Sequence, residues 1–329
     1  MITEKILVRY PALVKFLTGR PAESFWELMN QVEAHFAEYE QQRHERSGRQ
    51  RAVGAGRRFD QPLVIRMMII LSYLRLHVPQ GLVALLFGTT QTDVSRDLRR
   101  LLPLLKPLRP VPDVWEVVGE GVPWPAAGRL PLEQWAAGRV RVDATEQVVY
   151  RAQDSQVRKR YYSGKKKAFT IKTQIVCDGE HHLVAISTAV PGTMHDKKLS
   201  DEVHTLARLP DGCEVDADKG YQGLADQVTL ITVRNAETGA EQQVPRLTVQ
   251  IPVRKPKGKE LTEEQQTFNR QLAAVRVRVE HTIGWVKNWA IIATRFRCAH
   301  TIYTAVLQVV CGLVNGQTQR WQAARTAAS

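Results

Sequence analysis

The residues best suited to chemistry in this sequence are three carboxylates that stand far apart along the chain. Asp143 lies inside the valine-rich run RVRVDATEQVVY, where a buried, unpaired carboxylate is costly, so it needs a metal ion, a partner or a hydrogen-bond network. Asp218 closes a short strand-like pattern in EVDADKGYQG, just before a glycine turn, which is a frequent place for a metal ligand. Glu280 lies in a long helical pattern near the end of the chain.

The helix face that carries Glu280 also carries Arg276 and Lys287, at spacings i, i+4 and i+11, and Gly284 leaves it open to a metal ion or a phosphate backbone. Two strands and a late helix that each supply a carboxylate meet the needs of a two-metal phosphoryl-transfer site. Mg²⁺ prefers carboxylate oxygens, and two ions activate the attacking oxygen and stabilise the leaving one. We therefore predict that Asp143, Asp218 and Glu280 bind two Mg²⁺ ions, with Mn²⁺ as an alternative metal.

Each carboxylate also has a structural interpretation. Asp143 can be a structural acid of the sheet, and Asp218 can be a turn residue before Lys-Gly. Asp216 faces the same way as Asp218 and competes with it for the role of second acid. Glu280 can form an i,i+4 ion pair with Arg276 on a solvated face, which is the commoner account of such a pair taken singly.

Hydrophobic patterning predicts the elements that position these residues. Strands are expected over residues 139–150, 169–177, 183–190, 213–217 and 247–253, and helices over 196–206, 261–289 and 304–317. A strand meander followed by strands that alternate with helices predicts an α/β fold, with a mixed sheet flanked by helices. The first and fourth strands are neighbours in such a fold, which would bring Asp143 and Asp218 together.

Residues 62–105 predict three helices, the third of which is capped by Thr90 with Asp93 at the N3 position of a capping box. A helix, a short helix, a glycine turn and a third helix with a polar outer face are typical of a helix-turn-helix. Candidates for contacts with base edges or phosphates on that face are Gln91, Thr92, Ser95, Arg96 and Arg99. A three-helix bundle without DNA binding is the alternative, because every such bundle has a polar outer face.

The net charge favours an anionic partner. The 46 Lys and Arg residues exceed the 33 Asp and Glu residues by 13, and the longest apolar runs are too short to span a bilayer. The basic residues crowd three segments: a loop at 43–58 (Arg43, Arg46, Arg49, Arg51, Arg57, Arg58), a turn at 158–167 (Arg158, Lys159, Arg160, Lys165, Lys166, Lys167) and a loop at 254–259 (Arg254, Lys255, Lys257, Lys259). Each suits phosphate contacts, and a solvated loop is the alternative for each.

Five motifs, in this order, resemble those of bacterial insertion-sequence DDE transposases, in the broad DDE superfamily endonuclease group that includes Harbinger-like elements. They are V-D-A-T at 142–145, Y-Y-S-G-K-K-K at 161–167, P-G-T-M-H-D at 191–196, D-K-G-Y at 218–221, and Arg276, Glu280 and Lys287, which match the R-E-K part of a Y-R-E-K signature. Each motif is weak alone, but five in order over roughly residues 60–300 are specific.

The resemblance implies an RNase H-like catalytic domain preceded by an all-α helix-turn-helix domain. It implies metal-ligand roles for the three carboxylates and supporting roles for Arg276, Lys287, His195 and Asp196. The chain departs from the signature at Ala273, where the family has its tyrosine. Asp196 is an alternative second acid. We favour Asp218, because it ends a strand beside the first one, and interpret Asp196 as a helix cap or a residue that supports the metal ligands.

These observations predict four regions: a helical and basic segment at 1–59, a helix-turn-helix at 60–106, a proline-rich linker at 107–138 and a catalytic domain at 139–320. The predicted protein is a DNA transposase that binds terminal inverted repeats, cleaves the ends and transfers them to target DNA as a homodimer. The rivals are a catalytically silent DNA-binding protein and a metal-dependent nuclease without strand transfer. We expect no secretory signal, no disulfide framework and a cytoplasmic, nucleoid-associated location.

Overall fold

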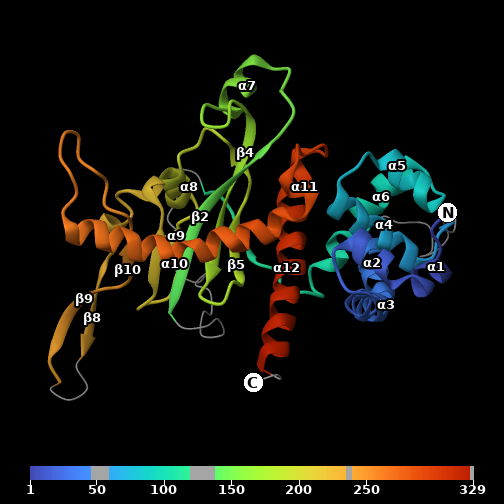
Figure 1. The fold of residues 1–329 in the computed structure, drawn as a ribbon, viewed down its shortest axis with the longest axis horizontal. Coiled ribbons are helices and arrows are strands. Elements are labelled where there is room, and N and C mark those ends of the chain that lie inside the picture. Colours follow the sequence, from blue (N-terminus) through green and yellow to red (C-terminus); the bar gives the residue numbers. More distant parts are fainter. Residues whose placement is uncertain (46–58, 119–137, 235–238, 327–329) are drawn as a thin grey trace. The chain divides into compact units, whose positions relative to one another are not determined.

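The computed structural model describes residues 1–45, 59–118, 138–234 and 239–326, which form two compact units (Figure 1). One unit combines Met1–Val111 with Val286–Gly316, and the other combines Pro112–Trp285 with the C-terminal residues from Gln317. The basic loop at 46–58 and most of the predicted linker, at 119–137, lie outside the described residues.

The first unit is helical throughout its described residues. Its helices are α1 (Glu4–Arg9), α2 (Pro11–Thr18), α3 (Ala22–His44), α4 (Leu63–Leu76), α5 (Gln80–Phe87), α6 (Gln91–Leu101), α11 (Ala290–Ala293) and the first part of α12 (Tyr303–Thr326). Helix α4 is mostly apolar and is buried from Val64 to Leu74, so it forms the centre of this unit. Within this unit, Arg20 links the N-terminal helices to the C-terminal segment, because its guanidinium donates a hydrogen bond to the carbonyl of Leu313 (3.1 Å).

The capping box predicted for α6 is confirmed. The Thr90 hydroxyl accepts a hydrogen bond from the amide of Asp93 (3.2 Å) and donates one to the Asp93 carboxylate (2.6 Å). This contact lowers the pKa of Asp93, because the hydroxyl stabilises the charged carboxylate. The short helix before it, α5, ends at Gly88 in the left-handed conformation (φ 66°).

Replacement of this cap gives a first prediction. We expect Thr90→Ala to lower the free energy of unfolding by about 1 kcal/mol, because the first turn of α6 loses its side-chain acceptor. Urea unfolding followed by circular dichroism measures the loss. Thr92→Ala, an exposed threonine two residues further on, is the control, and an equal loss in that variant would contradict the capping role.

The second unit contains a mixed sheet. Its main strands are β1 (Asp113–Trp115), β2 (Arg139–Val148), β4 (Ala168–Asp178), β5 (Leu183–Ser187), β7 (Glu214–Ala217) and β10 (Thr248–Gln250). Their order is β1-β5-β4-β2-β7-β10, with β2, β4 and β5 antiparallel in turn and with β7 and β10 parallel to β2. The predicted mixed sheet flanked by helices is confirmed, and this order is compatible with an RNase H-like fold.

Helices cover both faces of this sheet. Helix α10 (Glu263–Lys287) crosses in front of the strands in Figure 1. Leu199 of α8 (Asp196–Glu202) and Val203, which follows this helix, belong to the core that contains Val140 and Val142 of β2, and Leu206 of α9 (Thr205–Arg208) packs against it. The remaining elements are α7 (Ser155–Tyr161), β3 (Tyr162–Ser163), β6 (Val190–Pro191) and a separate hairpin of β8 (Leu230–Arg234) and β9 (Glu241–Pro245).

The structure differs from the predicted elements at several places, among them the strand expected over 183–190, which ends at Ser187, and that expected over 247–253, which is β10 alone. The single helix expected over 196–206 is two, because His204 between them adopts a left-handed conformation (φ 52°). The last helix extends to Thr326 rather than to residue 317. The segment predicted as a linker includes β1, because Trp115 is buried there and the strand pairs with β5.

In the described part of the chain, no helix is long and apolar enough to cross a membrane.

The three helices predicted for residues 62–105 are present, whereas their use as a DNA-binding helix-turn-helix stays a prediction.

Candidate active site

The sheet register places Asp143 opposite Asp218. Strands β2 and β7 pair in parallel with Val142 beside Ala217, so the next residues of the two strands meet at the carboxyl end of β7. The Asp143 carboxylate accepts the amide of Ala144 (2.7 Å), and that of Asp218 accepts the amide of Gly220 (2.5 Å). The expected proximity of the first and fourth strands is thus confirmed.

The environment of Asp143 disfavours its charged form. Burial raises the pKa of Asp143 to about 6, and the neighbouring carboxylates of Asp218 and Asp196 add to this effect. The Ala144 amide and the Arg276 guanidinium act in the opposite direction. Such like charges held together create a place where a cation is favoured, because it relieves the repulsion.

Asp216, the rival second acid, faces arginines. Its carboxylate accepts two hydrogen bonds from the Arg139 guanidinium (2.8 and 2.9 Å), and Arg141 lies 3.8 Å from it. Asp216 is buried and its oxygens are engaged in this bidentate pair. The geometry therefore favours Asp218 over Asp216 as a ligand that faces solvent.

Asp196 begins α8, but the side chain that caps this helix is that of His195, which accepts the amide of Lys197 (3.3 Å). The interpretation of Asp196 as a cap is therefore wrong. Its carboxylate accepts instead from the Lys172 ammonium (2.7 Å). A Cβ on Gly220 would lie 2.7 Å from an oxygen of Asp196 and 2.8 Å from an oxygen of Asp218, so any other residue there would push these carboxylates away from the turn.

The helix α10 brings Arg276 close enough to Asp143 to favour its charged form. Glu280 is exposed on the same helix, and Lys287 is the last residue of α10. The position that a Cβ on Gly284 would occupy is surrounded by open space, so this face of α10 is open there, as predicted from the glycine. Among the described residues, no three His, Cys, Asp or Glu side chains converge closely enough to hold a metal ion. The participation of Glu280 thus stays a prediction.

Two residues near the carboxylates were missed by the sequence reasoning. Tyr221, in the D-K-G-Y motif, is fully buried, and its hydroxyl has no partner among the described groups. Burial, followed by the charges of Asp143, Asp196 and Asp218, raises the pKa of Tyr221. Lys172 is buried in the middle of β4. The sequence feature that could have identified it is a lysine inside a strand pattern otherwise rich in apolar residues.

The polar face of α6 borders a groove of about 550 Å³ within the first unit. Gln91, Ser95 and Arg99 line it on one side, and residues 297–302 line it on the other, with Arg297 among them. Arg99 donates to the Ser95 hydroxyl (3.2 Å), while Arg96 is exposed and lies 3.7 Å from Asp93. Thr92 is also exposed.

The basic turn at 158–167 projects from the end of the sheet that carries Asp143 and Asp218, because it connects the carboxyl end of β2 to the amino end of β4. Arg158, Lys159 and Arg160 belong to α7, whereas Lys165, Lys166 and Lys167 are exposed in the turn that follows β3. The Thr193 hydroxyl donates to the carbonyl of Arg160 (2.6 Å), which links this arm to the P-G-T-M-H-D loop.

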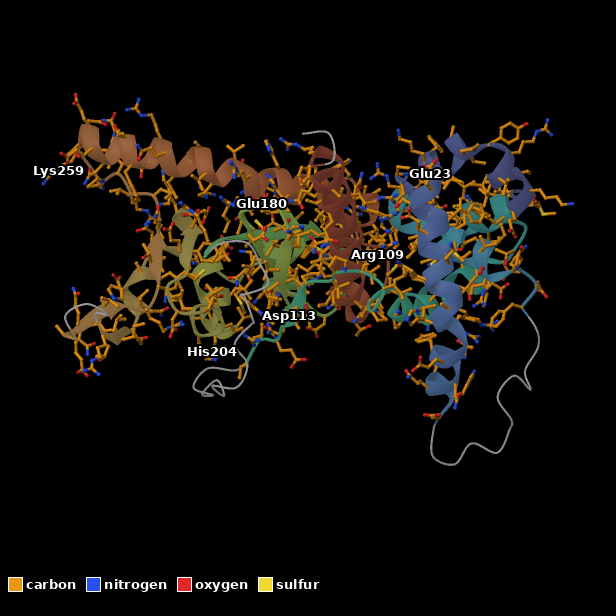
Figure 2. The ribbon with its side chains drawn as sticks, turned by 90° about the horizontal axis from the view of Figure 1, so that it is seen from below. Glu23, Arg109, Asp113, Glu180, His204 and Lys259 are labelled. Carbon is orange, nitrogen blue, oxygen red and sulfur yellow. The ribbon has the colours of Figure 1, made fainter. Side chains whose placement is uncertain are left out.

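The basic residues of the other two segments differ from one another in exposure and in ion pairing. Arg254, Lys257 and Lys259 are exposed, and Figure 2 shows Lys259 beside the start of α10. Lys255 pairs with Glu260. Arg43 pairs with Glu40 (3.1 Å), and the other arginines of the loop at 43–58 (Arg46, Arg49, Arg51, Arg57, Arg58) lie outside the described residues.

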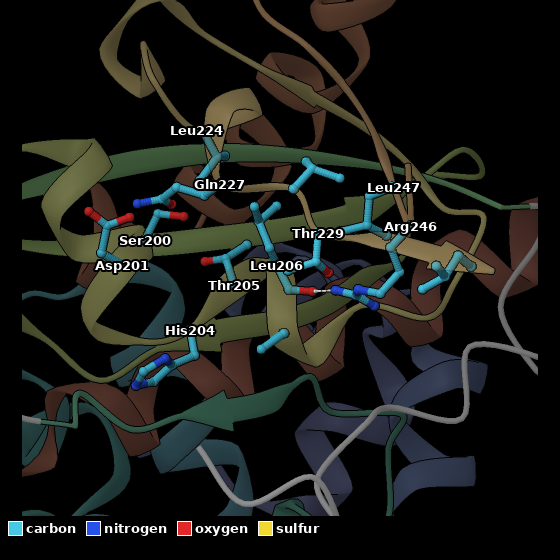
Figure 3. A pocket seen from close by; sticks show the side chains of 13 residues that line it. Ser200, Asp201, His204, Thr205, Leu206, Leu224, Gln227, Thr229, Arg246 and Leu247 are labelled. Carbon is cyan, nitrogen blue, oxygen red and sulfur yellow. Dashed lines mark hydrogen bonds between the residues drawn. The ribbon is translucent and has the colours of Figure 1, made fainter. Parts of the chain in front are cut away.

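A cavity of about 670 Å³ lies beside α8 and α9 (Figure 3). Arg246 crosses its wall and donates to the carbonyls of Leu206 and Leu209. Of the described residues that line this cavity, none is a predicted catalytic residue. The cavity is therefore not the place where the carboxylates meet.

Comparison with known proteins indicates the family of this chain. The chain is 29% identical over 176 residues to the probable transposase for insertion sequence element IS702 of Microchaete diplosiphon, a match that covers 54% of this chain and 56% of that protein. No solved structure matches the chain. Residues 142–315, just over half of the chain, match the DDE superfamily endonuclease family, whose members generally act with divalent metal ions. The chain belongs to the DDE superfamily endonucleases, as its resemblance to insertion-sequence transposases predicted.

Proposed function

We propose that this protein is a DNA transposase that binds the terminal inverted repeats of its element, cleaves at their ends and joins them to target DNA. The observation that carries the proposal is the proximity of Asp143 and Asp218 just beyond the last paired residues of β2 and β7, at the end of the sheet from which an exposed basic arm projects. The carboxylates supply a site for a cation, and the arm supplies contacts for the phosphates of a DNA strand.

The residues present fit a divalent metal. Asp143 and Asp218 offer hard oxygen ligands, and their mutual repulsion is the kind that a bound cation relieves. Glu280 is the proposed third ligand. Two bound Mg²⁺ ions, or Mn²⁺ in their place, would activate the attacking oxygen and stabilise the leaving one. Arg276, whose charge acts on Asp143, orients this carboxylate, and Lys287 and His195 support the site from the ends of α10 and α8.

The proposed reaction has two steps that use the same carboxylates. Water first hydrolyses a phosphodiester at the element's end and leaves a free 3′-hydroxyl. That hydroxyl then attacks a phosphodiester of the target DNA, which forms one bond and breaks another without an external energy source. Because two ends must be joined, we propose a homodimer or a larger synaptic assembly.

Cleavage and joining of a supercoiled plasmid that carries the element's ends, in Mg²⁺, test this proposal. A transposase releases the element and yields joined products. A nuclease without strand transfer yields nicks and breaks but no joined ends, and a catalytically silent DNA-binding protein yields neither. Either of the last two results would replace the proposed function with the corresponding rival.

We propose that the groove beside α6 receives the inverted repeats, with Gln91 and Ser95 toward base edges and Arg99 toward phosphates. Thr92 and Arg96, which are exposed on α6 outside the groove lining, are proposed to add a base contact and a phosphate contact. Among the described residues that line this groove, the charged ones are Arg99 on one side and Arg297 on the other, so the charge of the groove complements DNA. This assignment treats residues 60–106 as the helix-turn-helix.

Loss of one of these arginines gives a second prediction. We expect Arg99→Ala to lower the affinity for a duplex of the inverted repeats and to reduce the slope of log Kd against log [KCl] by about 1, since one phosphate contact is lost. Fluorescence anisotropy measures this slope between about 50 and 300 mM KCl, a range over which the salt dependence of phosphate contacts can be measured. Lys15→Ala, in α2, removes an exposed charge outside the groove and should leave the slope unchanged.

A further inference from the structure

Lys172 is a buried cation next to the proposed metal-binding carboxylates. Its ammonium donates to the Asp196 carboxylate (2.7 Å) and to the carbonyl of Met194 (2.6 Å), and it lies 3.7 Å from the Glu146 carboxylate. The side chain is 8% exposed, so it cannot reach a DNA phosphate directly. Its charge acts most strongly on the carboxylates of Asp196 and Glu146 that lie next to it.

Asp196 stands between this lysine and the site. One carboxylate oxygen accepts from Lys172, while the other lies 2.7 Å from the place of a Cβ on Gly220, on the side where Asp218 also approaches. Asp196 is close enough to raise the pKa of Asp143. A further carboxylate beside the proposed ligands Asp143, Asp218 and Glu280 would compete for the ion unless its charge is compensated.

We propose that Lys172 is a positioning residue that fixes Asp196 beside Gly220 and neutralises its charge, so that the metal is bound by Asp143 and Asp218 and not by Asp196. This inference rests on the proposed function of the site. Glu146 completes the arrangement on the far side of the ammonium, and the Thr170 hydroxyl holds it in place by donation to the other carboxylate oxygen (2.9 Å).

Lys172→Met is expected to bind metal more tightly and yet to cleave DNA more slowly. Without the ammonium, Asp196 adds an uncompensated negative charge beside Asp218, so the full-length protein should bind Mn²⁺ roughly tenfold more tightly. Cleavage should fall roughly 100-fold, because the ion is drawn toward Asp196 and away from the productive position. Titration calorimetry with Mn²⁺ in the absence of DNA gives the affinity, and plasmid nicking gives the rate.

The double variant Lys172→Met/Asp196→Asn separates this role from a structural one. Removal of both charges should return the Mn²⁺ affinity and the cleavage rate to within about threefold of the wild type, if the pair is coupled as proposed. Lys172→Arg should retain most activity, since it preserves the cation. Lys198→Met, which removes a surface lysine that pairs with Glu202 on α8, is the matched control and should change neither readout.

The outcomes are distinct. Tighter Mn²⁺ binding with slower cleavage in Lys172→Met, restored in the double variant, supports the inference. Unchanged or weaker binding in a folded Lys172→Met protein overturns it, as does a double variant that stays as slow as the single one. If the wild type itself binds no Mn²⁺ and cleaves no DNA, the proposed metal-dependent function fails instead.

Discussion

Asp218→Asn is expected to reduce DNA cleavage by roughly 1,000-fold or more while DNA binding is retained. The substitution preserves the size of the side chain and an oxygen that can accept the Gly220 amide, so the turn after β7 is kept. It removes one anionic ligand from the site, and loss of a metal's transition-state stabilisation is worth several kcal/mol, at about tenfold in rate for each 1.4 kcal/mol. Supercoiled-plasmid nicking in Mg²⁺ measures the rate.

Asp216→Asn is the matched control, because Asp216 is a carboxylate only two residues earlier, within β7. This carboxylate is paired with Arg139, so its loss leaves a guanidinium without its bidentate partner and lowers the stability of the sheet. We expect a lower midpoint in urea but measurable cleavage under conditions where the protein is folded. If Asp216→Asn abolished cleavage and Asp218→Asn left it intact, the assignment of the second acid would be reversed. Asp196→Ala tests the remaining alternative in the same assay.

Asp143→Asn is expected to abolish cleavage and, in the absence of metal, to make the protein more stable at neutral pH. The pKa of Asp143 is raised to about 6 in the folded protein, from an ordinary value of 3.8. Between these values the folded state holds a proton that the unfolded state has lost, so stability falls as the pH rises through this window. Above pH 6 the charged carboxylate costs up to about 3 kcal/mol, a cost that the neutral amide avoids.

Urea unfolding in EDTA, at pH 4 and at pH 7.5, measures this effect. The gain of Asp143→Asn over the wild type should be large at pH 7.5 and small at pH 4, where the wild-type carboxyl is mostly protonated in the folded state. The amide oxygen can still accept from Ala144, so the local hydrogen bond is not the variable. A gain independent of pH would contradict the electrostatic explanation. Mg²⁺ should stabilise the wild type and leave the variant unaffected.

Local patterns in the sequence were sufficient to predict the mixed sheet and to single out the carboxylates of Asp143 and Asp218 as candidates. The alternation around Asp143 identified an acid inside a strand, and the register of β2 and β7 places it beside Asp218 as the strand order requires. Thr90 and Asp93 identified the start of α6, because a capping box involves residues only three positions apart. These features depend on neighbours in the chain, which the sequence displays directly.

The partners of the individual carboxylates depended on tertiary structure. Asp216 and Asp218 have the same parity and similar surroundings in the sequence, and only the pairing of β2 with β7 shows that Arg139 engages the first of them. Lys172 lies 24 positions from Asp196, and its role became visible only when β4 and α8 were packed together. Likewise, the segment 286–316 packs with the N-terminal helices although its place in the sequence suggested the catalytic domain.

The sequence by itself therefore determined the family, the mixed sheet and the carboxylates around which a metal site is proposed. Only the tertiary structure decided which of those carboxylates are neutralised by cations and which are left to face one another. The physical reason is that periodicity and capping arise from interactions within a few residues, whereas charge compensation depends on side chains that meet through strand register and helix packing. The sequence alone gives the number of charged residues, whereas the fold determines which of them form pairs.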